Sequence, residues 1–272
     1  MEEVFRGIWV IAYRELLRFI QERSRMLSSF AMPLLFLVIF GAGFNRIIGS
    51  LMPGIDFIQF IYPGIIAMTV LMNSVMSGLS VVWDREFGFL KEVLVSPLSR
   101  SGIVLGKAVG SATVALIQGF ILLLLAPLLG VSLDLALVAK LVPILIVISL
   151  SLSGLGILVA SRMRSQQGFQ MVVQLIIFPL IFLSGVFFPV NNVPAWLEVL
   201  SKANPLTYGV DAIRQLFLAG DIAASGAAGS GDFVFGVTVF GHTMSILEDV
   251  AIVAIFGAIL MSLAVWSFSK QE

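Results

Sequence analysis

The sequence contains no cysteine, a single histidine and few charged residues. Charged side chains make up 12% of the 272 residues, whereas a soluble domain usually carries about 25%. The absence of cysteine excludes disulfide bonds, thiolate metal ligands and a cysteine nucleophile. Sixteen basic and sixteen acidic residues cancel, so no basic surplus exists to bind nucleic acid.

Apolar residues, by contrast, make up 59% of the chain. A soluble protein of this length could not bury so much apolar surface, so the excess must face lipid. A bilayer core of about 30 Å requires roughly 20 apolar residues per helix. We identify six such stretches, and the sequence therefore predicts an all-α integral membrane protein with six transmembrane helices. They cover residues 28–44, 57–83, 103–129, 141–160, 169–188 and 250–268.

The basic residues predict the orientation of these spans. Most of them lie before the first span, between the second and third, between the fourth and fifth, and after the last. The positive-inside rule places these segments, and both termini, on the cytoplasmic side. We expect the membrane to be a cell (inner or plasma) membrane. Lys107 is the one charge inside a predicted span, and we expect it to snorkel to the interface because it lies near the helix end.

The first 27 residues form a separate element. Apolar residues recur there at helical spacing, while Arg14, Arg18, Gln21 and Arg25 occupy another face. The pattern predicts an amphipathic helix in the cytoplasmic interface, with its arginines toward anionic lipid headgroups. It leaves open whether this helix links to a cytosolic partner or only anchors the chain. The apolar positions are Phe5, Ile8, Trp9, Ala12, Leu16, Phe19 and Ile20.

A glycine pattern at the start of the third span superficially resembles a phosphate loop. A Walker A loop requires four residues between its glycines and a Ser or Thr after the lysine. Here three residues separate Gly102 from Gly106, and Ala108 follows Lys107. We therefore expect Gly102, Gly106 and Gly110 to form a flat face for close helix packing.

Two kinds of enzyme site are poorly supported. Residues 229–232 resemble the Gly-x-Gly-Asp element of intramembrane aspartyl proteases, but Asp232 lies in a polar loop and no predicted span holds a second aspartate. An intramembrane serine protease would need a histidine facing a serine, and His242 precedes the last span. No metal site is expected, since Cys is absent and His is single. An ion-coupled carrier is disfavoured because no acidic or basic residue lies mid-membrane.

Neutral polar residues do occur within the spans. Such groups must find hydrogen-bond partners in lipid, and most are expected to join neighbouring helices. A few could instead line a substrate path, and we predict Asn73, Gln118 and Gln174 for that role.

The connection between the second and third spans has its own pattern. Residues 84–97 predict a short cytoplasmic amphipathic helix that ends at Ser96 and Pro97, and Ser99 can cap the next span. Such a helix is suited to dock in a groove of a soluble protein. Its apolar positions include Phe87, Leu90, Val93 and Leu94.

This connection resembles that of the permease subunits of type-2 ABC exporters, in the branch with drug-resistance and lipid exporters. The resemblance implies that the segment is a coupling helix that contacts an ATPase. It assigns this contact to Arg85, Glu86, Phe87, Gly88, Leu90, Lys91 and Glu92.

A second stretch, after the fifth span, is similar to the same family. There the resemblance implies short helices that re-enter the outer leaflet as a hairpin. Asn204 before Pro205 is a suitable helix start, and Asp211 and Arg214 are spaced to pair along one helix. The hairpin residues are Pro189, Pro194, Trp196, Asn204, Pro205, Tyr208, Asp211 and Arg214. Tyr62-Pro63-Gly64 in the second span also fits the family pattern.

The resemblance covers essentially the whole chain and implies one transmembrane domain. Residues 1–27 form the interfacial helix, 28–190 the first five spans, 191–248 the external re-entrant region and 249–272 the last span and tail. It also implies a homodimer, or a close heterodimer, bound to two separate ATPase subunits, which would hold the ATP and Mg²⁺. The expected function is outward transport of a drug, lipid or glycolipid. A membrane enzyme, such as an intramembrane protease, and an ATP-independent channel or carrier remain the alternatives.

Overall fold

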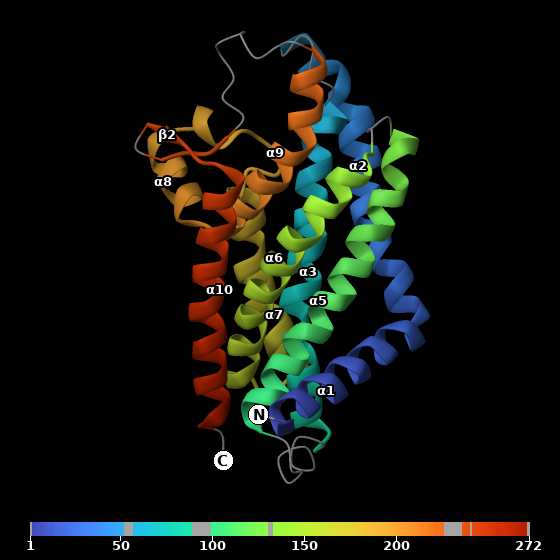
Figure 1. The fold of residues 1–272 in the computed structure, drawn as a ribbon, viewed down its shortest axis with the longest axis vertical. Helices are drawn as coiled ribbons and strands as arrows, with labels where there is room; N and C mark the ends of the chain where they lie inside the picture. The colour runs from blue at the N-terminus through green and yellow to red at the C-terminus, as the bar shows by residue number, and fades with distance from the viewer. Residues whose placement is uncertain are drawn as a thin grey trace.

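The computed structural model describes residues 2–51, 57–88, 99–129, 133–225, 236–239 and 241–270. These residues are almost entirely helical, with long helices running side by side between two ends of the molecule (Figure 1). The long helices are α2 (Arg23–Leu51), α3 (Phe57–Glu86), α5 (Arg100–Leu125), α6 (Leu135–Arg162), α7 (Gln166–Leu183) and α10 (Ile246–Ser269). The shorter elements are α1 (Glu2–Gln21), η1 (Ala126–Leu129), η2 (Val190–Asn192), α8 (Ala195–Ala203), α9 (Pro205–Ser225), β1 (Thr238–Val239) and β2 (His242–Thr243).

Five of these helices are long and apolar enough to cross a membrane. They are α3, α5, α6, α7 and α10, and they coincide with the predicted second to sixth spans. The predicted first span lies within α2, whose apolar part, Phe30–Gly41, is shorter than the others. The described residues thus show an all-helical membrane protein with five candidate spans. The apolar part of the predicted first span does not reach the length of these five.

Serine side chains begin three of the long helices. The Ser99 hydroxyl accepts a hydrogen bond from the Gly102 amide at 3.1 Å, which confirms the predicted cap of α5. Ser165 caps α7 in the same way, and Ser245 forms a reciprocal capping box with Glu248 at the start of α10. These caps satisfy amide groups that have no carbonyl partner within their helix.

The central helices approach each other closely because small residues line their contacts. A Cβ atom added to Gly78 of α3 would lie 2.2 Å from the carbonyl oxygen of Gly156 in α6. A Cβ atom added to Gly257 of α10 would lie 2.0 Å from the hydroxyl of Ser151, also in α6. Small residues permit such close backbone contact, which is the main source of helix association in lipid. Helix α6 is therefore held between α3 and α10.

Helix α1 lies across one end of the bundle, at the end that also holds the chain terminus of α10 (Figure 1). Its predicted apolar face is divided: Phe19 is buried, whereas Phe5, Trp9 and Ile20 are more than half exposed. Ile11, which was not assigned to that face, is buried against α5. The helix therefore packs on α5 with one side and leaves a separate apolar stripe uncovered.

The opposite end of the bundle holds α8, α9 and a short antiparallel pair of strands (Figure 1). In this pair, Thr238 lies opposite Thr243, and Gly241 occupies the turn with a φ of +80°. The sequence analysis did not anticipate the strands. The protease-like residues 229–232 lie outside the described residues.

Candidate functional site

The last turn of α3 carries a buried carboxylate, Asp84, that is only 2% exposed. One of its oxygens lies 2.8 Å from the guanidinium of Arg14 in α1, and the other lies 2.8 Å from the ammonium of Lys107 in α5. Lys107 also donates to the Ser80 hydroxyl at 2.8 Å and lies 3.3 Å from Glu15. A buried charge is costly unless it is paired and hydrogen-bonded, and this cluster supplies both.

This cluster corrects the expectation for Lys107. The side chain does not snorkel to the interface, because it is 2% exposed and its nitrogen lies between α1 and α3. The ammonium group pairs with the carboxylates of Asp84 and Glu15 instead. The ion cluster, defined as Arg14, Glu15, Asp84 and Lys107, thus ties three helices together.

The neighbours of Asp84 contact the remaining helices at this end. Arg85 donates to the carbonyl oxygens of Ser161 and Met163, at the end of α6. A cation is favoured there by the helix dipole. Glu86 accepts from the Gln166 amide at the start of α7 at 3.3 Å. The guanidinium of Arg18 in α1 lies 4.5 Å from the centre of the Trp83 ring.

The last turn of α3 therefore contacts the four helices α1, α5, α6 and α7. Its residues are Trp83, Asp84, Arg85 and Glu86. The helix ends at Glu86, and Gly88 follows two residues later with a φ of +81°, which favours glycine. The predicted coupling element of residues 84–97 thus begins too early, since residues 84–86 belong to α3. Phe87 is exposed after that turn. Leu90, Lys91 and Glu92 lie outside the described residues.

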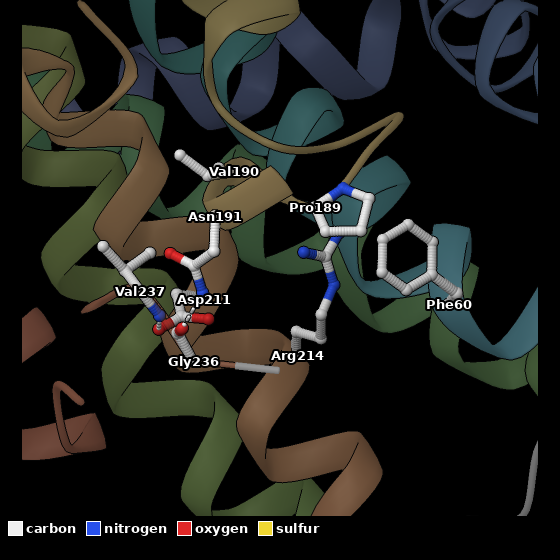
Figure 2. A pocket seen from close by; sticks show the side chains of 8 residues that line it. All are labelled: Phe60, Pro189, Val190, Asn191, Asp211, Arg214, Gly236 and Val237. Atoms are coloured by element: carbon white, nitrogen blue, oxygen red, sulfur yellow. Dashed lines mark hydrogen bonds between the residues drawn. The ribbon is translucent and has the colours of Figure 1, made fainter. Parts of the chain in front are cut away.

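At the opposite end, Asp211 and Arg214 of α9 do not pair with each other, contrary to the spacing argument. Arg214 donates to the Gly185 carbonyl at 2.7 Å and lies 4.1 Å above the Phe60 ring. Asp211 accepts from the Val237 amide at 2.8 Å. Figure 2 shows the two side chains in different parts of one pocket, with Arg214 toward Phe60 and Asp211 toward Val237. Burial lowers the pKa of Arg214, and the nearby Asp211 carboxylate raises it. The resulting pKa of about 10 keeps the side chain cationic at neutral pH.

A polar network holds the strand segment against α9 and α10. The amide of Gln215 donates to Asp211 at 2.9 Å, to Asp249 at 3.1 Å and to the Met244 carbonyl at 3.0 Å. Asn191 donates to the Gly236 carbonyl at 2.7 Å and accepts from the Thr238 hydroxyl at 3.0 Å. Short side-chain amides thus connect segments that are far apart in the sequence.

The comparison with known proteins identifies the fold family. A family model described as ABC-2 type transporter matches residues 6–218. The chain belongs to the ABC-2 type transporter family. This confirms the resemblance to ABC permeases and makes the chain a multi-pass membrane component of a transporter.

Named relatives agree with this membership in the ABC-2 family. The transport permease ycf38 of Cyanophora paradoxa is 34% identical over 208 residues, covering 73% of this chain and 71% of that protein. The multidrug ABC transporter permease YbhR of Escherichia coli K12 is 36% identical over 173 residues, covering 61% of this chain and 45% of that protein. The match thus spans less than half of YbhR. Nodulation protein J of Rhizobium leguminosarum bv. viciae is 28% identical over 202 residues, or 74% and 77% of the two chains.

The predicted glycine face of this ABC-2 chain packs against α1. A Cβ atom added to Gly106 would lie 2.7 Å from the Ile11 Cβ, and one added to Gly110 would lie 2.8 Å from the Glu15 Cβ. One added to Gly102 would lie 3.2 Å from the Val4 carbonyl oxygen. The glycine face of α5 therefore packs against α1, the amphipathic helix of the same chain, and not against another span.

The predicted hairpin residues of the ABC-2 chain are brought together around the start of α9. Asn204 accepts from the Leu206 amide at 3.0 Å and donates to the Leu180 carbonyl at 2.7 Å. Tyr208 donates to the Lys202 carbonyl at 2.7 Å. Pro194 precedes α8, and Pro189 lines the pocket in Figure 2. Trp196 remains exposed on α8.

Among the described residues, the three side chains predicted to line a substrate path lie in different surroundings. Gln118 is fully buried, Gln174 is exposed on α7, and Asn73 lines a small pocket between α1, α3 and α5. The sequence pattern did not predict the members of these polar clusters Glu15, Asp84, Gln215, Asn191 and Asp249. One signal was available in the sequence. Asp84 directly follows one apolar span, and Lys107 lies near the start of the next span.

Proposed function

We propose that this chain is the membrane-spanning permease subunit of an ATP-binding-cassette exporter. It moves a hydrophobic or amphipathic substrate, such as a drug, lipid or glycolipid, outward with ATP hydrolysed by a separate subunit. The observation that carries this proposal is the last turn of α3, which contacts four other helices immediately before the segment that resembles a coupling helix.

The contacts of that turn explain how a coupling helix would act on the spans. A force applied to residues 87–98 enters the membrane part through α3. Asp84 is bonded at 2.8 Å to both Arg14 and Lys107, so displacement of α3 carries α1 and α5 with it. Arg85 and Glu86 engage the connection between α6 and α7. The Lys107–Asp84 pair is buried on both sides, and leaving one of these charges without its partner costs about 3–5 kcal/mol, which favours α3 and α5 remaining joined when α3 moves.

A second copy of the chain would cover the exposed face of α7. Met171, Leu175, Phe178 and Phe182 are all more than half exposed and recur at helical spacing on this helix. Gln174 is exposed on the same helix, and a polar amide at membrane depth needs a partner. A symmetric dimer through α7 would let the two Gln174 side chains bond to each other. We therefore propose a homodimer with two ATPase subunits.

The proposal includes the topology. Helix α2 crosses as the first of six spans, since its 29 residues exceed the length that a bilayer requires. Both termini are cytoplasmic in a cell membrane, and α8 and α9 form the re-entrant outer hairpin. Figure 1 supports this arrangement, since α1 and the end of α10 lie at one end of the bundle and α8 and α9 at the other.

The substrate class is supported by the composition of the spans and by one relative. The described spans hold few charged groups, and the cations and anions of the ion cluster compensate each other. YbhR is named for multidrug transport. A largely apolar path with scattered amides and hydroxyls fits an amphipathic molecule better than an ion.

The test replaces Leu90 by Asp in the proposed coupling segment. An affinity-tagged chain is purified from its native host in mild detergent, and Mg-ATP hydrolysis of the co-purified complex is measured. We expect a normal level of permease and a strong loss of co-purified ATPase activity, because a hot-spot contact typically contributes at least 2 kcal/mol. Thr243→Asp, on the exposed strand β2, is the matched control and should leave the activity unchanged. Equal ATPase activity with Leu90→Asp and with the control would refute the coupling role.

A further inference from the structure

A small polar pocket lies beside the ion cluster, between α1, α3 and α5. Its volume is about 30 Å³, which is room for a group the size of a water molecule or an ammonium ion. It is lined by Glu15, Phe19, Asn73, Ser77, Ser111 and Val114. The pocket thus combines four polar side chains with two apolar ones.

The polar walls offer more hydrogen-bond acceptors than donors. One hydrogen of the Asn73 amide nitrogen donates to the Thr69 carbonyl at 2.8 Å, which leaves the second hydrogen and the side-chain carbonyl oxygen for other partners. The Ser77 hydroxyl donates to the Ser74 carbonyl at 2.7 Å, so only its lone pairs remain. Ser111 is 6% exposed, and its hydroxyl has no hydrogen-bond partner among the described residues. A buried polar group without a partner is costly, which points to a bound group in this position.

The carboxylate of Glu15 has the longer cation contact of the two carboxylates in the ion cluster. Its ion-pair partner Lys107 lies at 3.3 Å, whereas the same ammonium lies 0.5 Å closer to Asp84, at 2.8 Å. Asp84 is also bonded to Arg14. Of the two carboxylates in the ion cluster, Glu15 is therefore the one with the weaker cation contact, and it is the one that lines the pocket.

We infer that this pocket binds the primary ammonium group of an amphipathic amine. An ammonium has three donors and no acceptor, which matches the oxygens of Glu15, Asn73 and Ser111. Phe19 and Val114 can contact the first methylene groups behind it. This inference rests on the proposed function and narrows it, since it places a recognition site for amine-bearing substrates at the α1 end of the bundle. The amine can come from a lipid headgroup or from a free amphipath, and the two sources share this chemistry.

Cysteine protection tests the site directly, because the chain has no native cysteine. The full chain carrying Val114→Cys is placed in phosphatidylcholine nanodiscs and reacted with a small methanethiosulfonate reagent. Dodecylamine should slow the reaction, whereas N-acetyl-dodecylamine, which has the same chain without the charge, should not. Gln167→Cys, exposed at the start of α7, is the control cysteine and should react equally fast in every condition.

Two further measurements identify a side chain that binds the amine and show whether the amine belongs to a lipid headgroup or to a free amphipath. Adding Ser111→Ala should raise the dodecylamine concentration required by about tenfold, because a hydrogen bond to a charged group contributes on that order. Slow labelling in nanodiscs containing phosphatidylethanolamine, without added amine, would assign the site to a lipid headgroup; fast labelling there would assign it to free amphipaths. Equal rates with dodecylamine, its acetylated form and no additive would overturn the proposal. The assay needs neither ATP nor ATPase, so its failure is distinct from failure of the exporter proposal.

Discussion

The ammonium nitrogen of Lys107 in α5 lies 2.8 Å from a carboxylate oxygen of Asp84 in α3. Both side chains are almost completely buried, and 23 residues separate them in the sequence. The pair joins the helix that precedes the proposed coupling segment to the helix that follows it. These two helices are therefore fixed to each other at the point where an ATPase would act.

We predict that Lys107→Met destabilises the protein strongly. It leaves Asp84 with Arg14 as its one remaining cation, and removing one partner of a buried pair costs about 3–5 kcal/mol. The thermal stability of the detergent-solubilised chain, followed by size-exclusion chromatography, should fall clearly. The matched control is Lys202→Met, which breaks a pair with Glu198 that is partly exposed on α8. Such a pair contributes about 0–1 kcal/mol, so similar losses for the two variants would contradict the role of the buried cluster.

The packing of α1 on α5 predicts a local effect of Gly106→Leu. The new side chain would overlap Ile11, because even a Cβ atom would lie 2.7 Å from that residue. Overpacking costs about 1–3 kcal/mol, so α1 should detach while the spans remain folded. Limited proteolysis within α1 should become faster. Gly43→Leu in α2 is the control, since none of the described residues outside its own helix backbone lies within 4 Å of its added Cβ. Unchanged proteolysis of Gly106→Leu would show that α1 does not pack on this face.

At the opposite end, Asn191→Ala should release the strand segment. The variant loses the hydrogen bond to the Gly236 carbonyl and those from Thr238, each of which typically contributes about 0.5–1.5 kcal/mol. A cysteine introduced at Thr243 should then react faster with a thiol reagent. Trp196→Ala, on exposed α8, serves as the control and should not change the rate. Identical rates for the two variants would mean that Asn191 does not hold this segment.

The proposed orientation is testable with single cysteines in intact cells. Gln167→Cys lies at the α1 end of the bundle and should be protected from a membrane-impermeant reagent. Thr243→Cys lies at the α8 end and should be labelled. The reverse labelling pattern would place the proposed coupling segment outside the cell.

The sequence by itself determined the class of protein and the approximate position of its spans. Apolar runs long enough for a bilayer allow few other structures, because every backbone polar group in lipid must be satisfied within the segment. For the same local reason, the Ser99 cap and the start of α9 at Pro205 could be predicted. Each depends on residues that are close together in the chain.

The tertiary structure decided which charged residues meet and what the small residues contact. Lys107 lies near a helix end, so the sequence favours snorkelling, and only the position of Asp84 and Glu15 beside it makes burial favourable. Asp211 and Arg214 have the spacing of a helical pair, yet the Val237 amide and the Gly185 carbonyl, both distant in sequence, bind them instead. The glycine face of α5 could have met any helix, and the fold placed α1 there. Spacing along one helix defines which neighbours are possible, whereas the competing partners come from other helices and depend on how the bundle packs.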